Sequence, residues 1–236
     1  MRRTVQGAIQ CMLVGAVVLS GTELRGQDAR ATIAVLPFEN SGSYGQDREA
    51  FDALEAGLPA ILSATLAAHP AVTVVERGRL DQTLGQQKLA AAHRWDAGSA
   101  TEIAKATGAR YAVSGSFADF YGKFRINARV VDAQTGQILK VVSNDDPKLQ
   151  DRAQLGAILQ VVADRIVGAM GLAPYPPDVA ARRRGVPTDA LTEFSRGIMF
   201  EGRGERAKAA EAYQRALTSA PDLDEARSGL RRVKAG

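Results

Sequence analysis

Short apolar strands alternate with helical segments along the first half of the chain, and this order leaves few folds open. Ala31–Phe38 (ATIAVLPF) is apolar and rich in β-branched residues, as expected of a buried strand. Apolar residues at helical spacing follow from Phe51 to Leu66, and Val72–Val75 is a second short strand. Further helical segments lead to a third strand at Tyr111–Phe117. Helical crossovers join parallel strands by right-handed connections, so this half predicts a parallel β–α–β–α–β core.

The alternation of strands and helices stops after the third strand, and a pair of consecutive strands follows. Apolar and polar residues largely alternate from Phe124 to Val131, which is typical of a strand with one buried face. A tight connection at Asp132–Gly136 leads to another strand at Gln137–Val142, completing an antiparallel meander. A longer helix is expected from about Leu149 to Met170. The predicted fold class is therefore α/β, with helices packed on a mixed sheet.

Several single residues mark where these elements should bend or end. Pro59 should kink its helix or start the second half of it, because proline has no N–H. Ser99, with Glu102 three residues later, is typical of a helix N-cap, and Gly108 of the residue that follows a helix. Gly115 lies inside a strand, where glycine marks a bulge or a close backbone approach.

The first 29 residues have the layout of a secretory signal peptide. Arg2 and Arg3 precede a 13-residue, mostly apolar run at Ala8–Ser20. A membrane-spanning helix needs about 20 apolar residues, so a cleaved leader is favoured over an anchor. The one cysteine, Cys11, follows Gln10 rather than a small residue and does not fit a lipoprotein signal. We therefore expect a mature periplasmic chain with no transmembrane segment and no disulfide.

The charge of the chain argues against nucleic acid as a partner. The formal net charge is +4, and residues 1–26 hold half of it. A nearly neutral remainder gives no electrostatic basis for binding a phosphate backbone. The basic cluster Arg182–Arg184 lies in a segment, 172–188, that contains four prolines and is expected to be a stiff, solvated linker.

Residues 189–236 fit the frame of one tetratricopeptide repeat with a capping helix. The small and aromatic positions of the frame, counted back from Pro221, fall on Ala216, Tyr213, Ala209, Gly204 and Gly197, with Phe200 at the usual tyrosine position. Leu230 and Val233 of the last helix should face inward. A single repeat is too small to be stable alone, so it must pack on the α/β domain, on a second copy or on a partner. Its aromatic residues Phe194, Phe200 and Tyr213 are the candidate partner-binding residues.

Residues 30–171 resemble the curli-secretion channel (CsgG-like) family and the related TolB N-terminal-like envelope domains. Four stretches carry the resemblance in the family's order: IAVLPFEN at Ile33–Asn40, VTVVERGRLDQTL at Val72–Leu84, ATGARYAVSGSF at Ala106–Phe117 and INARVVDAQTGQIL at Ile126–Leu139. The resemblance implies a periplasmic α/β domain associated with outer-membrane assembly or secretion, and often oligomeric.

The chain departs from the channel members of that family at the late strands. Those members make a pore from two membrane hairpins in each subunit, and each hairpin needs about 20 residues. Here only Tyr121 and Gly122 separate two strands, and only Ser143–Pro147 lie between the last strand and the next helix. We therefore expect the family's scaffold without its pore.

No group of residues has the spacing of a catalytic or metal site. The two histidines, His69 and His93, stand apart from other ligating residues, and surface or capping roles are expected for both. The loop Ser41–Gly45 follows a strand but matches neither a dinucleotide-binding nor a P-loop motif. Asp119 and Asp132 stand near strand ends, where aspartate usually caps turns. We predict a protein without catalysis, cofactor or metal.

The leading hypothesis is a periplasmic accessory or scaffold protein of an outer-membrane assembly or secretion system, which binds envelope proteins. Self-association into a homo-oligomer and peripheral contact with the membrane are both compatible with it. The alternative is a periplasmic sensor of a small ligand, such as a nucleotide or a cell-wall fragment, held where parallel strands end. Its candidate rim is Asn40, Ser41, Ser43, Tyr44 and Arg77. A hydrolase with an unrecognised site is a third hypothesis, which no cluster of residues supports.

Overall fold

The computed structural model describes residues 30–43, 48–87, 95–148 and 151–235. The expected signal peptide, Tyr44 and His93 lie outside these ranges. The α-helices of the described part are α1 (Arg48–Ala67), α2 (Arg77–Gln86), α3 (Ala97–Thr107), α4 (Leu155–Ala169), α5 (Pro177–Arg184), α6 (Thr188–Gly202), α7 (Arg206–Ser219) and α8 (Asp224–Ala235). A short 3₁₀ helix, η1 (Arg152–Gln154), precedes α4.

The sheet is mixed, as the sequence predicts. Its strands are β1 (Ala31–Asn40), β2 (Val72–Val74), β3 (Tyr111–Phe120), β4 (Lys123–Asp132) and β5 (Gln137–Ser143), and they lie in the order β2-β1-β3-β4-β5. Strand β1 pairs in parallel with both β2 and β3, whereas β3, β4 and β5 form an antiparallel meander. The predicted fold class is confirmed, and the two-residue turn between β3 and β4 has the length read from the sequence.

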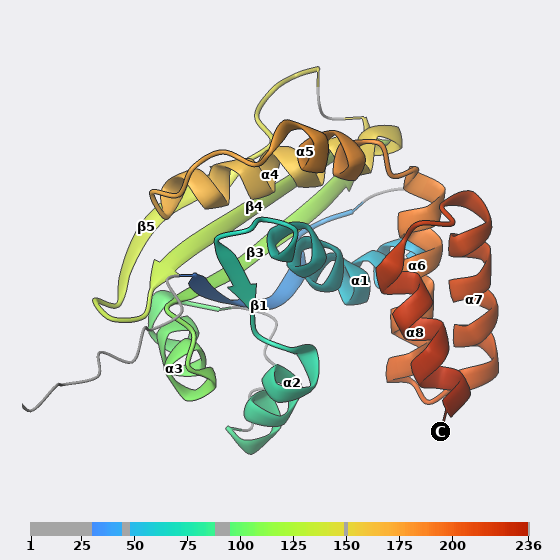
Figure 1. Cartoon of the computed structure of the whole chain (residues 1–236), viewed down its shortest axis with the longest axis horizontal. Helices are drawn as coiled ribbons and strands as arrows, with labels where there is room; N and C mark the ends of the chain where they lie inside the picture. The colour runs from blue at the N-terminus through green and yellow to red at the C-terminus, as the bar shows by residue number, and fades with distance from the viewer. Residues whose placement is uncertain (1–29, 44–47, 88–94, 149–150, 236) are drawn as a thin grey trace, which may run out of the picture.

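Helices cover both faces of the sheet and bury two apolar clusters (Figure 1). The larger cluster joins one face of β1, β3 and β4 to α1 and α4, and continues into α6, α7 and α8. The smaller one packs α2 and α3 against the opposite face, around Leu36, Ile103 and Val131. Burial of this apolar surface is the main stabilising contribution to the fold.

Two strand irregularities shape the centre of the sheet. The register of β1 against β3 shifts between Val35 and Phe38, where Pro37 has no N–H to donate to a ladder. Opposite this bulge, a Cβ on Gly115 would lie 2.2 Å from the carbonyl oxygen of Asn127 and 2.6 Å from the Phe38 ring. The prediction of a close approach at Gly115 is therefore confirmed.

The start of α3 differs from the sequence-based expectation. The N-cap is Asp96, whose carboxylate accepts a hydrogen bond from the backbone N–H of Ser99 at 2.7 Å, so the helix begins three residues earlier than expected. Ser99 lies inside the first turn and donates its own hydroxyl to the same carboxylate. Aspartate is at least as good an N-cap as serine, and the sequence offered both. Gly108 ends the helix with φ 71°, as predicted.

The expectation of a solvated linker over residues 172–188 is wrong. This segment contains α5, and the side chains of Tyr175 and Ala180 are buried in the larger cluster. Tyr175 donates its hydroxyl to the carbonyl of Thr65 in α1, and Arg183 forms an ion pair with Glu225 of α8 at 2.5 Å. The other two residues of the basic cluster, Arg182 and Arg184, have side chains that are at least half exposed, and they form ion pairs with Asp178 and Asp164 respectively. Prolines exclude regular strand and helix interiors, but they do not prevent a segment from packing. The domain division at residue 172 stays a prediction.

Helices α6 and α7 form an antiparallel pair that α8 closes. The ring of Tyr213 on α7 is fully buried between the other two helices. A Cβ would lie 2.4 Å from this ring at Gly197 of α6 and 2.5 Å from it at Gly229 of α8, so both positions require glycine. Val233 faces inward, and Leu230 packs partly buried against the core. We call α6, α7 and α8 together the helical hairpin; its assignment as a tetratricopeptide repeat stays a prediction.

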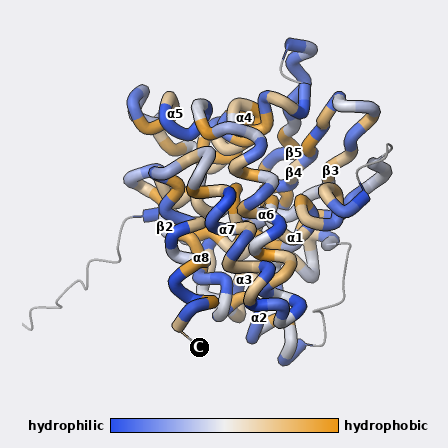
Figure 2. The backbone as a smooth tube through the Cα atoms, turned by 90° about the vertical axis from the view of Figure 1, so that its right-hand side faces the viewer, coloured by the Kyte–Doolittle hydropathy of each residue, from blue (hydrophilic) through white to orange (hydrophobic). Residues whose placement is uncertain are grey.

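The helical hairpin packs on the α/β part through α1 and α6 (Figures 1 and 2). The two helices approach each other closely at Gly57, where a Cβ would lie 2.1 Å from the Ser195 hydroxyl oxygen and 2.6 Å from its Cα. The sequence left open whether the helices after residue 188 pack on the α/β part, on a second copy or on a partner. In this chain they pack on the α/β part. The two parts therefore share one core rather than standing as separate bodies.

Helix α1 is a core helix despite its composition. Within the described ranges it is the one helix long and apolar enough to cross a membrane, but half of its most apolar window is buried inside the protein. Leu54, Leu58 and Leu62 are each about 1% exposed. Pro59 lies within α1, and the helix continues on both sides of it although proline has no N–H to donate.

Candidate functional site: a groove between the α/β part and the helical hairpin

A groove of about 960 Å³ separates the helical hairpin from one edge of the α/β part. We call it the hairpin groove. One wall comes from α1 and the start of α2, the other from the end of α6 and from α8, and the open edge of β1 lies at its base. Its lining includes the apolar residues Val35, Pro37, Ala56, Pro59, Ala60, Val75, Leu80, Phe194 and Ile198.

The groove exists because β2 is short. Pairing of β1 with β2 covers only Ala31 to Ile33, and the last backbone bond of this ladder runs from the Val75 N–H to the Ile33 carbonyl at 2.8 Å. The chain then turns away into α2, whereas β1 continues to Asn40. Val35 and Pro37 consequently line the groove where a longer β2 would have paired.

A charged network holds the hairpin side of the groove in place. Glu201, at the end of α6, accepts two hydrogen bonds from the Arg232 guanidinium at 2.9 and 3.0 Å, and one from the Tyr213 hydroxyl at 2.5 Å. Burial alone would raise the pKa of Glu201, but these hydrogen bonds and the nearby charges of Arg232 and Arg77 hold it below its ordinary value. Burial, followed by the contact with Glu201, raises the pKa of Tyr213.

The charged lining of the groove is mainly acidic. Two cationic side chains, Arg77 and Arg232, line it, against the six carboxylates of Glu55, Glu76, Asp81, Glu201, Asp224 and Glu225. Asp81 and Asp224 are at least 60% exposed at its rim. This excess is local, because the whole chain carries a formal net charge of +4.

The candidate ligand rim does not form a single site. Arg77 lines the hairpin groove, whereas Asn40, Ser41 and Ser43 do not. Since β2 pairs beside Ile33, the carboxyl end of β2 lies about seven residues, or roughly 23 Å, short of the end of β1. The rule that parallel strands bring their ends together fails here because the strands differ in length.

The three polar residues after β1 build a turn instead. The Asn40 side-chain oxygen accepts hydrogen bonds from the backbone N–H and the hydroxyl of Ser43, at 3.0 and 2.7 Å. Ser41 donates its hydroxyl to the carbonyl of Phe117, and Ser43 accepts a bond from the N–H of Asp119. These contacts are of the kind that asparagine and serine make in turns.

Two of the three candidate partner-binding aromatic residues are core residues. Tyr213 is fully buried and Phe194 is 3% exposed, with their ring centroids 5.9 Å apart. Only Phe200 keeps exposed surface, and Lys208 lies over its ring. Sequence spacing cannot distinguish an aromatic residue that faces outward from one packed between two glycines. We therefore withdraw Tyr213 as a direct contact. Phe194, which lines the hairpin groove although it is almost buried, and Phe200, which lies outside that lining, stay candidates.

The titratable residues considered as chemical groups have structural partners. Of the surface or capping role expected for His69, the surface part is wrong because the side chain is buried. Its Nδ1 accepts from the Ala71 N–H just after α1, as a capping residue would, which leaves Nε2 as the donor to the Ala173 carbonyl at 2.9 Å. Asp119 accepts from the Gly122 N–H within the β3–β4 turn, and Asp132 pairs with Arg110 at 3.0 Å. In the described ranges, no three metal-ligating residues gather at one place.

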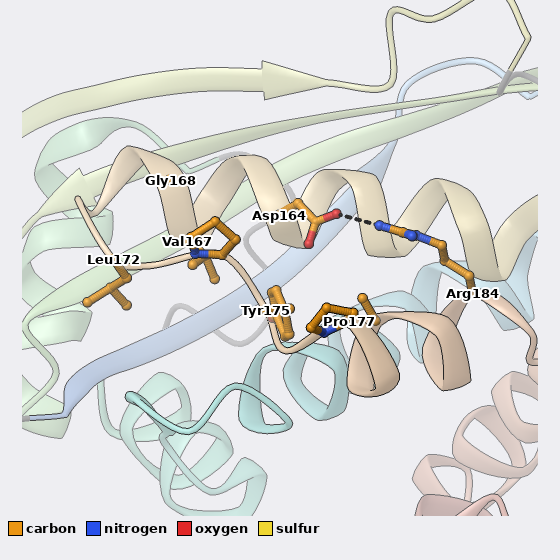
Figure 3. Close-up of a pocket in the computed structure, with 9 residues that line it drawn as sticks. Asp164, Val167, Gly168, Leu172, Tyr175, Pro177 and Arg184 are labelled. Atoms are coloured by element: carbon orange, nitrogen blue, oxygen red, sulfur yellow. Dashed lines mark hydrogen bonds and ion pairs between the residues drawn. The ribbon is translucent and has the colours of Figure 1, made fainter.

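A second, smaller cavity of about 470 Å³ lies between α4 and the segment that leads into α5 (Figure 3). Tyr175 and Pro177 form one side of it, and Val167 forms the other. The pair Asp164–Arg184, 3.3 Å apart, lies at one end. This cavity has about half the volume of the hairpin groove, and the residues that line it come from neighbouring segments of the chain.

Comparisons with known proteins bear on the α/β part. The family model of the curli production assembly/transport component CsgG matches residues 14–125, just under half of the chain. The match includes three of the four stretches that carry the resemblance, whereas Ile126–Leu139 lies beyond its end. No curated protein matches the chain.

Solved structures give more distant likenesses. The C-terminal domain of LpoB from Escherichia coli is 20% identical, with a TM-score of 0.40, over 50% of this chain and 83% of that one. TolB from Acinetobacter baumannii is 20% identical, with a TM-score of 0.41, over 61% and 29%. Lipoprotein GNA1162 from Neisseria meningitidis is 20% identical, with a TM-score of 0.37, over 58% and 96%. Likenesses at this distance carry no argument about function.

The family match and the order of the strands and helices agree for the first half of the chain. The resemblance read from the sequence is thereby confirmed where the family model matches. Over residues 14–125, the chain is similar to the family of the curli production assembly/transport component CsgG.

Proposed function

We propose that this chain is a non-catalytic accessory protein of the bacterial cell envelope, which binds a protein partner in the hairpin groove. The proposal includes export to the periplasm and a scaffold that lacks the pore-forming hairpins of the channel members. It extends the family likeness to the whole chain and gives the helical hairpin a role.

The observation that carries the proposal is that both parts of the chain line the same groove. A hairpin that served only to complete the core would need no open side against the α/β part. Here α6 packs on α1 at Gly57, while the end of α6 and the side of α8 from Asp224 to Arg232 line a groove of about 960 Å³ together with α1 and the start of α2. Concave sites between two structural parts are preferred places for binding.

The alternative of a small-ligand sensor is weaker for anionic ligands such as nucleotides. Its rim is divided between two places, and the one rim residue that lines the groove, Arg77, lies among six carboxylates. Like charges at close range disfavour binding of a phosphate group. The smaller cavity offers one cation, Arg184, which is already paired with Asp164.

Site-specific photo-crosslinking in living cells tests the proposal. A photoreactive residue at Ser63 or Ser228 would stand in the groove, and one at Glu102 or Glu211 would stand on exposed helix faces outside it. We expect a discrete adduct of the same mass from both groove positions and none from the other two. Adducts that are equally strong at all four positions, or missing only from the groove, would refute the proposal.

Filling the groove provides the matched control. Gly78 lines the groove, and a Cβ added there meets nothing within 4 Å, so we expect Gly78→Trp to fold and to obstruct the groove. Gly85 on the same helix is equally open but lies outside the lining. We expect Gly78→Trp to abolish the adduct and Gly85→Trp to leave it unchanged.

A further inference from the structure

We propose that the occupant of the hairpin groove is an extended, cationic peptide segment, in which lysine or arginine side chains alternate with apolar ones. This inference rests on the proposed function and names the chemistry of the partner at that same site.

Charge complementarity is the first argument. Three of the six carboxylates, those of Glu76, Asp81 and Asp224, belong to exposed residues at the rim and come from opposite walls. A concave surface with low-dielectric walls concentrates the field of the charges that line it. Lysine and arginine side chains of a segment lying between the walls could therefore reach carboxylates on both sides.

The base of the groove supplies the apolar half of the match. Pro37 from β1, and Ala56, Pro59 and Ala60 from α1, are partly exposed and form an apolar surface in the groove, with the buried Val35 behind them. Alternate side chains of an extended segment point to opposite faces. Apolar side chains would thus contact this base while the intervening cations reach the rim.

Three arginines adjust this preference rather than reverse it. Arg77 and Arg232 belong to the lining, and Arg227 forms an exposed pair with Asp224 on its own helix. Arg232 is committed to Glu201 by two hydrogen bonds. Arg77 is half-exposed and pairs with Asp81 at 3.4 Å, one turn away on α2. Exposed pairs of this kind are weak and exchange readily for another partner. A cation entering the groove can replace Arg77 at Asp81.

Fluorescence anisotropy with a defined probe tests the inference. The probe is a short labelled peptide of alternating lysine and leucine, and the comparison peptide has glutamate in place of every lysine. We expect the purified chain to bind the lysine peptide at least about tenfold more tightly, and to lose several-fold in affinity between about 50 mM and about 500 mM salt. Equal binding of the two peptides, or no binding of the lysine peptide, would overturn the inference.

Neutral variants locate the interaction. The combined changes Glu76→Gln, Asp81→Asn and Asp224→Asn should weaken lysine-peptide binding about tenfold, since each exposed carboxylate contributes a modest amount. The matched control neutralises three exposed acids outside the groove: Glu102→Gln, Asp146→Asn and Glu211→Gln. Arg77→Gln should change affinity in the opposite direction, strengthening it about threefold. An equal loss in the two triple variants would place the peptide elsewhere on the surface.

The outcomes separate this inference from the proposed function. If Gly78→Trp abolishes the crosslinked adduct in cells while the triple variant in the groove leaves it intact, the groove binds a partner whose chemistry is not cationic. If neither change affects the adduct, both proposals are wrong.

Discussion

At the scale of single residues, Tyr213 does the most to define the helical hairpin. Its ring fills the space between Gly197 and Gly229, and its hydroxyl donates to Glu201, which also holds Arg232. One side chain thus connects the packing of three helices to the charged wall of the groove. Any change in the protonation of Glu201 should therefore be measurable in the stability of the hairpin.

Acid should remove that contribution. The pKa of Glu201 is lower in the folded chain than its ordinary value of 4.5, so its stabilising effect is complete above 4.5 and is lost as the pH falls through the folded-state pKa. Glu201→Gln should lower the free energy of unfolding by about 1–3 kcal/mol near neutral pH, because hydrogen bonds to a charged group are lost. Urea unfolding measured at several pH values should show this difference shrinking below 4.5; a difference that stays constant into acid would contradict the assignment.

At the scale of elements, the crossing of α1 and α6 fixes the hairpin to the sheet. Gly57 and Ser195 are the small residues that permit it, and the Ser195 hydroxyl is satisfied within its own helix by the Leu191 carbonyl at 2.8 Å. The larger apolar cluster runs without a break from the sheet through this contact. Separating the two helices would therefore open the core as well as widen the groove.

Gly57→Ala should destabilise the whole chain. The added methyl group would lie within 2.6 Å of the Ser195 backbone, and relieving such overpacking costs about 1–3 kcal/mol. Gly85→Ala is the matched control: with nothing within 4 Å, it should stabilise α2 by about 0.4–1 kcal/mol. Urea unfolding followed by fluorescence of Trp95, the one tryptophan, gives both values. Wild-type stability of Gly57→Ala would mean that the crossing is not close.

The contrast between the predicted and the observed elements has physical causes. The positions of the strands, the antiparallel meander and the helix end at Gly108 follow from local periodicity and backbone conformation, which a sequence carries directly. The packing of Tyr175 and the burial of Phe194 depend on contacts between distant segments, and no local pattern encodes them. The groove was missed for the same reason: the short pairing of β2 left Arg77 and Asn40 at different places. Gly57 and Gly229 inside helices were signals of close packing that could have been used.

At the scale of the whole molecule, the chain is a CsgG-like α/β part with a helical hairpin packed against one side. The hairpin adds one wall of a groove whose other wall the α/β part already provides. This arrangement accounts for a single helical unit that is too small to be stable alone: it is stabilised by α1, and in the proposed function it also provides one wall of the binding groove. On this account, neither part binds the partner by itself.

Hydrogen–deuterium exchange of the purified chain, with and without the lysine–leucine peptide, tests that claim most directly. The account predicts slower exchange on both walls at once, at the start of α2 around Arg77–Leu80 and at the end of α6 around Ile198–Gly202. It predicts no change at the β3–β4 turn, where Tyr121 is 86% exposed and does not belong to the groove lining. Protection confined to one wall, or found at that turn instead, would contradict a site built jointly by the α/β part and the helical hairpin.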